Sequence, residues 1–272
     1  MRRYTSFTSL STATVGCALL LVACGAEGEG EGEGLEGTEA APGISGEGAT
    51  GEGAGEGEGE GEGASDTDLA SNDGAYLQAL GEVRGHVFAC ITLYRQGATE
   101  MAATHAKHPE SEIYQTLVPA IKARKQPGFA DGLTALTTAL EEGGDVEGTY
   151  AQLLTNIKKH QPELSLGKTI IALSGLVRTA ADEFKLGVDG TGAIVNAREY
   201  QDAYGFLNTA KAILTAKTPN GSAAQSAKTD ALTQLDTALA QFGDLTAQTS
   251  DGDVTKIYGA AARMEITGLG VK

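Results

Sequence analysis

Apolar side chains recur at helical spacing from Asp66 to Lys272, and this recurrence is the feature that most restricts the fold. Ala, Leu, Gln, Lys and Glu dominate the segment, whereas the aromatic and β-branched clusters with alternating polarity that mark strands are missing. A segment of about two hundred residues is long enough to bury one core. The sequence therefore predicts an all-α domain over residues 69–272, an antiparallel bundle of about eight helices.

Glycine and proline breakers divide this segment. They stand at Gly97, Pro109, Gly143-Gly144, Pro162, Gly187 to Gly190, Pro219-Asn220-Gly221 and Asp251-Gly252. The helices predicted between them cover residues 74–96, 98–107, 110–125, 129–142, 145–160, 163–186, 191–217, 222–242 and 252–266. Short connections of this kind favour antiparallel neighbours.

A weak internal repeat indicates two related halves. The run from Gly132 to Leu140 parallels the run from Ala231 to Leu239, and each is followed by an acidic turn that ends in Asp-Val and then by a helix with a tyrosine. Such a correspondence is typical of duplication of a helical unit, and the alternative is chance similarity between helices rich in Ala, Leu and Thr.

Residues 24–68 have a different composition from the rest of the chain. From Gly25 to about Ser65 they are almost wholly Gly, Glu and Ala, without Lys, Arg or aromatic residues. Glycine maximises backbone entropy and regularly spaced carboxylates repel one another, so we expect a disordered tether with a reach of about 35 Å. Alternating glycine leaves no fixed geometry for a specific cation site, although many carboxylates raise the local cation concentration.

The N-terminus predicts a signal peptide over residues 1–23. A basic start at Arg2 and Arg3 precedes an apolar run from Val15 to Val22 that is too short to span a bilayer. The sequence Leu-Val-Ala-Cys ending at Cys24 resembles a bacterial lipobox. The resemblance implies cleavage before Cys24 and lipidation of its thiol, including palmitate-type acyl chains; the alternative is a plain signal peptide and a free thiol. Gly25 after the cysteine implies delivery to the outer membrane.

The charge balance excludes nucleic acid as a partner. The formal net charge of −16 owes much to the 14 acidic residues within 25–68, and the rest of the mature chain has an acidic excess of only four. Neither a basic patch for nucleic acid nor one for anionic lipid is expected on such a domain. Three cysteines leave Cys90 alone after removal of Cys17 and lipidation of Cys24, so no disulfide forms within the domain.

Three of the four histidines fall within one short stretch. His105 and His108 lie three residues apart and His86 lies four residues before Cys90, so each pair shares a helix face. Imidazole and thiolate are ligands for Zn, Cu or Fe. The alternatives are that His105 and His108 cap a short helix before Pro109, and that Cys90 is an inert core residue.

A second candidate cluster lies at Glu199 and Asp202, which share a face of the predicted 191–217 helix among tyrosines. Buried carboxylates need partners, and His86 is the expected one. Carboxylate and histidine ligands that project inward from facing helices form metal sites in bundles. The alternative is pairing with Arg84, Arg95 or Arg198. His160, at a predicted helix end, is expected on the surface.

Sequence signatures of enzymes are missing. The chain has no His-Glu-x-x-His helix, no Gly-x-Ser-x-Gly elbow and no phosphate-binding Gly-x-x-x-x-Gly-Lys-Ser/Thr loop. We therefore expect a protein that is not an enzyme; the alternative is a hydrolase that uses a His–carboxylate pair.

The layout of a lipobox, a helical domain of two related halves and the early Gly85-His86 pair resembles the imelysin-type periplasmic iron-uptake proteins. That family carries Gly-x-His-x-x-Glu, whereas here glycine directly precedes His86 and Ala89 stands in place of the glutamate. The resemblance implies a metal role for His86 only, so His105, His108, Glu199 and Asp202 would supply the remaining ligands.

Together these features predict a lipid-anchored protein of the bacterial cell envelope that faces the periplasm or the cell surface. Its helical domain is expected to bind Fe, Cu or Zn, or a ligand containing one, as a carrier or accessory subunit. The alternative is a metal-free helical module, without a cofactor, that docks an envelope protein.

Overall fold

The computed structural model describes residues 66–271. The predicted signal peptide, Cys24 and nearly all of the predicted tether lie outside the described residues. Within them the chain forms ten α-helices and one π-helix, with two isolated β-bridges and no longer strand. The prediction of an all-α bundle is confirmed. The elements are α1 (Asp66–Ser71), α2 (Asp73–Arg95), α3 (Thr99–His108), η1 (Pro109–Ile113), α4 (Tyr114–Ala123), α5 (Ala130–Glu142), α6 (Val146–Lys159), α7 (Leu166–Gly187), α8 (Ala197–Ala216), α9 (Ser222–Leu239) and α10 (Val254–Leu269).

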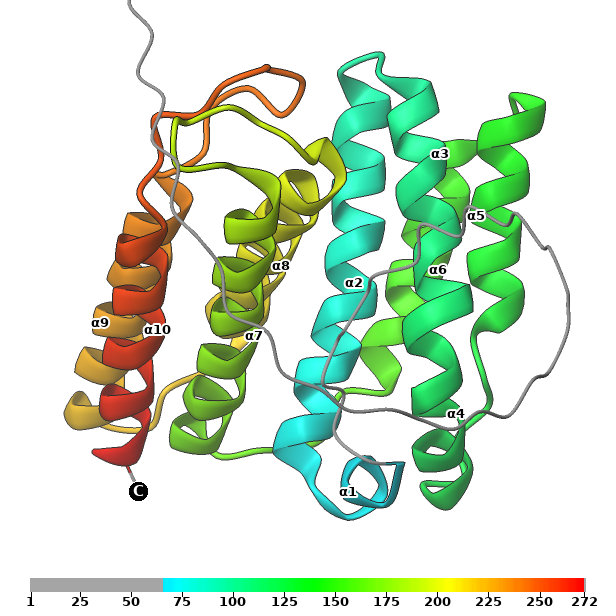
Figure 1. Cartoon of the computed structure of the whole chain (residues 1–272). Coiled ribbons are helices and arrows are strands. Elements are labelled where there is room, and N and C mark those ends of the chain that lie inside the picture. The colour runs from blue at the N-terminus through cyan, green and yellow to red at the C-terminus, as the bar shows by residue number, and fades with distance from the viewer. Residues whose placement is uncertain (1–65, 272) are drawn as a thin grey trace, which may run out of the picture. The chain divides into compact units, whose positions relative to one another are not determined.

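The helices form two groups that meet at α2. Helices α7 to α10 pack on one another on one side of α2, and α3 to α6 lie on its other side (Figure 1). Helix α2 contacts α3, α6, α7 and α8. Its buried face includes Leu77, Leu80, Val83 and Val87, all at most 2% exposed. This central helix therefore joins the two groups through one continuous core.

The two copies of the sequence repeat correspond to two pairs of consecutive helices, α5 with α6 and α9 with α10. The copies themselves fall on α5 and α9, and the Asp-Val pairs that follow begin α6 and α10. Asp145 accepts a hydrogen bond from the backbone N–H of Gly148, and Asp253 accepts one from Thr255. Both aspartates are N-caps, which satisfy donors that a helix start leaves without a partner.

Two predicted helix boundaries were wrong for local reasons. The helix predicted from residue 191 begins only at Ala197, because Oδ1 of Asp189 accepts hydrogen bonds from the backbone and hydroxyl of Thr191 and from the backbone of Ala193. This turn competes with helix formation. Pro109 does not separate two helices by a loop: α3 continues directly into the π-helix, of which Pro109 is the first residue, and then into α4.

None of the helices in the described part of the chain is long and apolar enough to cross a membrane.

Candidate metal centre

Two glycines set the close approach of α2 to α8. A Cβ atom at Gly205 would lie 2.2 Å from the backbone oxygen of Gly85, and one at Gly85 would lie 2.2 Å from Cδ1 of Phe206. No side chain therefore separates the helices at this point. His86 follows Gly85, and Asp202 lies one turn before Phe206, so both side chains are held at the same crossing.

His86, His105 and Asp202 converge where α2, α3 and α8 meet. One ligand atom of each lies within 4.8 Å of the others. Nδ1 of His86 is 2.5 Å and Nδ1 of His105 is 2.9 Å from Oδ1 of Asp202. The three residues are 5%, 1% and 1% exposed, in that order. The structure thus brings together three of the five residues that the sequence singled out as metal ligands.

Two buried atoms of this group lack a hydrogen-bond partner. Nδ1 of His86 approaches Asp202 closely, but not in the geometry of a hydrogen bond, and Oδ2 of Asp202 has no partner among the described residues. Leaving such groups unsatisfied in a buried place costs about 1–3 kcal/mol each, more for a charge. A cation bound here would accept lone pairs from both side chains.

Gln201 orients the ring of His105. Nε2 of Gln201 donates a hydrogen bond to the carbonyl of Leu245 at 2.9 Å, which directs Oε1 to Nε2 of His105 at 2.7 Å. Nε2 of His105 must therefore carry the hydrogen. In the metal-free protein Nδ1 donates a hydrogen bond to Oδ1 of Asp202 at 2.9 Å, and a neutral ring that keeps its hydrogen on Nε2 would offer the lone pair of Nδ1 to a cation in that place. Such outer partners fix the tautomer of histidines that bind metals.

The charged forms of His105 and Asp202 stabilise each other. Burial disfavours a charged His105, but the carboxylate of Asp202 and the hydrogen bonds that the ring donates to Asp202 and Gln201 outweigh burial and raise the pKa of His105. Burial likewise raises the pKa of Asp202, but the His86 and His105 rings outweigh burial and hold it below its ordinary value. Asp202 is therefore an ionised, buried carboxylate, which is the form that binds cations.

His108 and Glu199 lie beside the group but outside it. Nη1 of Arg198 donates to Nε2 of His108 at 2.5 Å, and Nη2 donates to Oε1 of Glu199 at 3.1 Å. Because Nε2 of His108 accepts from a guanidinium, that nitrogen is not directed at the three converging atoms. The alternative that Glu199 pairs with Arg198 is confirmed.

Sequence reasoning missed two carboxylates next to this group, Glu82 on α2 and Glu183 on α7. Burial, then the neighbouring carboxyl of Glu199 and the charges of Asp202 and Glu82, raise the pKa of Glu183 to about 9. Burial also raises the pKa of Glu82, which accepts a hydrogen bond of 3.2 Å from Gln78. The sequence held a signal for Glu82, which lies one turn before His86 and therefore shares its helix face.

The raised pKa of Glu183 predicts how the stability of the metal-free protein depends on pH. Above pH 4.5 the unfolded chain ionises Glu183 while the folded chain retains the proton, so the free energy of unfolding falls as pH rises from about 4.5 to about 9. We expect the free energy of unfolding of Glu183→Gln, which does not titrate, to exceed that of the parent by about 1–3 kcal/mol at pH 8. Each pKa unit is worth about 1.4 kcal/mol, and the total is discounted because the side chain is partly exposed. Urea unfolding at pH 5 and pH 8 measures the free energy of unfolding of the parent and the variant. Equal pH dependence in parent and variant would contradict it, and Glu265→Gln, which removes an exposed carboxylate, is the control.

Cys90 and His160 have structural roles. Cys90 is fully buried and burial raises the pKa of its thiol to about 12, which confirms the interpretation as a core residue. The surface position predicted for His160 was wrong, since it is 4% exposed. Its ring nitrogens contact the carbonyl oxygens of Asn156 at 2.9 Å and Pro127 at 2.7 Å, because the end of α6 packs against the loop before α5.

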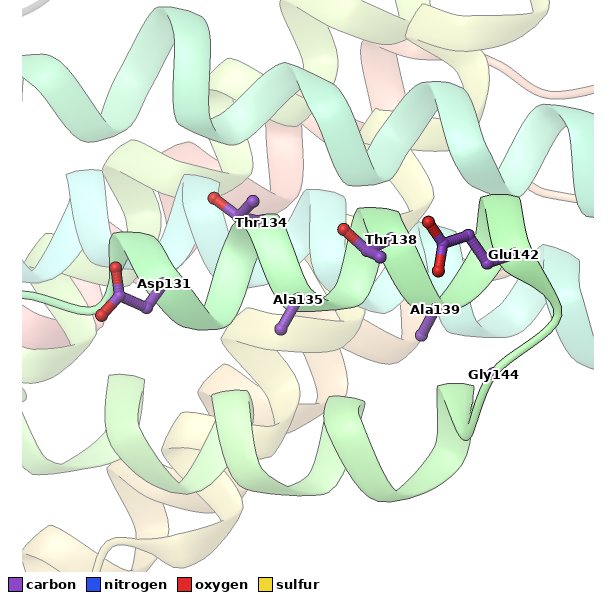
Figure 2. Close-up of a pocket in the computed structure, with 7 residues that line it drawn as sticks. All are labelled: Asp131, Thr134, Ala135, Thr138, Ala139, Glu142 and Gly144. Atoms are coloured by element: carbon purple, nitrogen blue, oxygen red, sulfur yellow. The ribbon is translucent and has the colours of Figure 1, made fainter.

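A shallow groove along α5 lies away from the metal centre. It has a volume of about 490 Å³, and threonines and alanines of α5 line it between Asp131 and Glu142 (Figure 2). These two acidic residues stand at opposite ends of the row, about 16 Å apart along the helix at 1.5 Å per residue. They cannot hold one ion, so the groove is not a candidate centre.

The comparisons with known proteins bear on the C-terminal group of helices. Residues 165–265 match the family described as the iron permease-associated 4-helix bundle domain. The match runs from the N-cap of α7 into α10 and covers less than half of the chain. No curated protein and no solved structure matches the chain. The match agrees with the broader expectation of a helical, iron-related protein.

The candidate centre spans the edge of the matched region. Asp202 lies inside it, whereas His86 and His105 come from α2 and α3 outside it. The carboxylate of the centre therefore belongs to the group α7 to α10, and the two imidazoles come from helices that pack against α8.

Proposed function

We propose that the domain binds a transition metal, with iron as its cargo, at His86, His105 and Asp202. The observation that carries this proposal is the convergence of three buried ligand atoms, two of which belong to side chains with unpartnered polar atoms. In this role Nδ1 of each histidine and the carboxylate of Asp202 hold the ion. Gln201 keeps the lone pair of His105 on Nδ1.

The chemistry of the donor set favours iron. Two imidazoles and one carboxylate form the ligand set that non-haem Fe²⁺ sites use, although Zn²⁺ also accepts it. A thiolate ligand, which would favour Zn²⁺ or Cu⁺, is not among the three residues. The match to an iron permease-associated domain points to the same metal.

We further propose that the protein is a carrier or accessory subunit of an iron-uptake system and not an enzyme. The lipobox-like sequence at Cys24 would anchor it to the envelope, in the outer membrane, and the tether would hold the domain near a membrane partner. The matched family is described as associated with an iron permease, which supports such a partner.

Metal binding by purified full-length protein tests this function. Equilibrium dialysis against Fe²⁺ without oxygen is expected to give tight binding in the parent and in His160→Gln. His160 is a suitable control because its ring hydrogen-bonds to the carbonyl oxygens of Asn156 and Pro127 and not to the three converging residues. His105→Gln is expected to lose this binding while circular dichroism shows unchanged helix content. Absence of Fe²⁺ and Zn²⁺ binding in the parent would favour the metal-free module that docks an envelope protein.

The role of Gln201 gives a separate prediction. Gln201→Leu removes the acceptor for Nε2–H of His105, and we expect Fe²⁺ affinity to fall about 10–100-fold, as for other outer-shell partners. Gln201→Glu retains an oxygen acceptor and is expected to bind more tightly than the leucine variant. Competition with a chromogenic chelator gives the affinities, and equal losses in both variants would exclude this role for Gln201.

A further inference from the structure

One guanidinium group holds His108 and Glu199 together beside the centre. Nη1 of Arg198 donates a hydrogen bond to Nε2 of His108 at 2.5 Å, and Nη2 donates one to Oε1 of Glu199 at 3.1 Å. Because Nε2 of His108 accepts this bond, it carries a lone pair, as the carboxylate oxygen does. Imidazole nitrogen and carboxylate oxygen are both ligands for Fe²⁺. Two ligand atoms therefore face a cation that belongs to the protein itself.

The guanidinium of Arg198 is incompletely satisfied in this position. Its Nε is buried and has no hydrogen-bond partner among the described residues. A buried donor without a partner costs about 1–3 kcal/mol. An imidazole also offers a single acceptor, whereas the fork of a guanidinium matches a carboxylate. The side chain is 40% exposed, so Arg198 can turn toward water. An ion that binds His108 and Glu199 can therefore displace it at low cost.

These two ligands lie one helical turn from the buried centre. His108 follows His105 by three residues on α3, so the two histidines share a helix face. Glu199 precedes Asp202 by three residues on α8 in the same way. The ring centroids of His108 and His86 are 5.6 Å apart. Helices α3 and α8 thus each present one ligand of the centre and one ligand of the neighbouring pair.

Exposure to solvent decreases from the outer pair to the centre. The side chain of Glu199 is 15% exposed and that of Arg198 is 40% exposed, whereas the three proposed ligands of the centre are at most 5% exposed. Of those three, His86 is the most exposed, and its ring contacts His108. The outer pair is therefore a partly exposed neighbour of the centre, as a point of entry for an ion must be.

We propose that His108 and Glu199 form an outer station through which Fe²⁺ reaches the buried centre. Arg198 occupies this station while it holds no ion, and the ion moves on from His108 to the neighbouring His86. The station binds Fe²⁺ less tightly than the centre because the protein supplies two ligands there and three at the centre. The inference rests on the proposed function, since the route leads to that centre.

Removal of the guanidinium tests whether the two outer ligands hold an ion. Full-length Arg198→Leu, dialysed against saturating Fe²⁺ without oxygen, is expected to hold one ion more per chain than the parent. The double variant Arg198→Leu/His108→Gln is expected to lose this additional ion. Arg178→Leu is the matched control, because Arg178 is also a helical arginine paired with a glutamate, Glu265. It is expected to hold as many ions as the parent.

The rates of Fe²⁺ loading and release test the route. In His108→Gln we expect both rates to fall about tenfold, which corresponds to about 1.4 kcal/mol in the barrier. The affinity at equilibrium is expected to stay that of the parent, whereas a purely structural role of His108 would lower it. Stopped-flow mixing with Fe²⁺ measures loading, and mixing of the loaded protein with excess chromogenic chelator measures release. His160→Gln is expected to keep both rates.

The outcomes distinguish the outer station from the centre. If Arg198→Leu holds no additional ion, or if His108→Gln loads and releases Fe²⁺ as fast as the parent, the proposal is wrong. An additional ion that persists in the double variant lies elsewhere and also contradicts it. In each of these cases a parent that binds one tight ion, lost in His105→Gln, leaves the proposed function standing. A parent without tightly bound Fe²⁺ contradicts the centre and the route together.

Discussion

Asp202→Asn is expected to abolish tight Fe²⁺ binding. The substitution keeps the shape of the side chain but removes the only carboxylate among the three converging residues, and with it the charge that opposes the cation. We expect the affinity to fall by more than about 100-fold, which exceeds the loss that follows removal of an outer-shell partner. Isothermal titration without oxygen measures the affinity of parent and variant.

Asp236→Asn is the matched control for this prediction. Asp236 is also a helical aspartate, but it is exposed and paired with Lys211 at 2.6 Å. Its substitution is expected to leave Fe²⁺ affinity unchanged. If Asp202→Asn binds Fe²⁺ as tightly as the control, Asp202 is not a ligand and the proposed centre is wrong.

Gly205→Ala is expected to separate α2 from α8. The added methyl group meets the backbone oxygen of Gly85 at 2.2 Å, and backbone cannot move aside as a flexible side chain can. Overpacking of this kind costs about 1–3 kcal/mol, and we expect a value near the upper end. For a domain of about two hundred residues this lowers the melting temperature by about 5–10 °C.

The same substitution is expected to weaken Fe²⁺ binding, because separation of the helices moves His86 away from Asp202. Gly259→Ala on α10 is the control, since the nearest atom to its added methyl group is the mobile end of Arg263 at 3.4 Å. That variant is expected to be as stable as the parent or more stable by about 0.5–1 kcal/mol, since alanine favours helix. Thermal melts followed by circular dichroism compare the three proteins. Equal melting temperatures would show that the close approach at Gly205 does not contribute to the fold.

Helix type and most helix ends could be predicted from the sequence because they depend on local chemistry. Gly143, with φ of 71°, ends α5 in a conformation that glycine favours, and Asp145 and Asp253 begin α6 and α10 as caps. The start of α8 was predicted too early because the turn around Asp189 depends on side-chain hydrogen bonds that composition does not reveal.

The candidate centre could be predicted only in part, because its members come from helices far apart in the chain. Spacing placed Glu199 and Asp202 on one face, and His86 was the expected partner. Whether a histidine faces the crossing of α2 and α8 depends on the helix rotation that Gly85 and Gly205 set, which spacing does not give. Gln201 and Glu183 were missed because their residue types are common on exposed helix faces.

Anomalous diffraction at the iron edge, from crystals of the protein loaded with Fe²⁺ without oxygen, tests the central claim most directly. We expect a peak within about 2.0–2.3 Å of Nδ1 of His86, Nδ1 of His105 and an oxygen of Asp202, the usual range for metal bonds to nitrogen and oxygen. A peak only at surface carboxylates, or none in crystals of protein that has taken up iron in solution, would contradict the account.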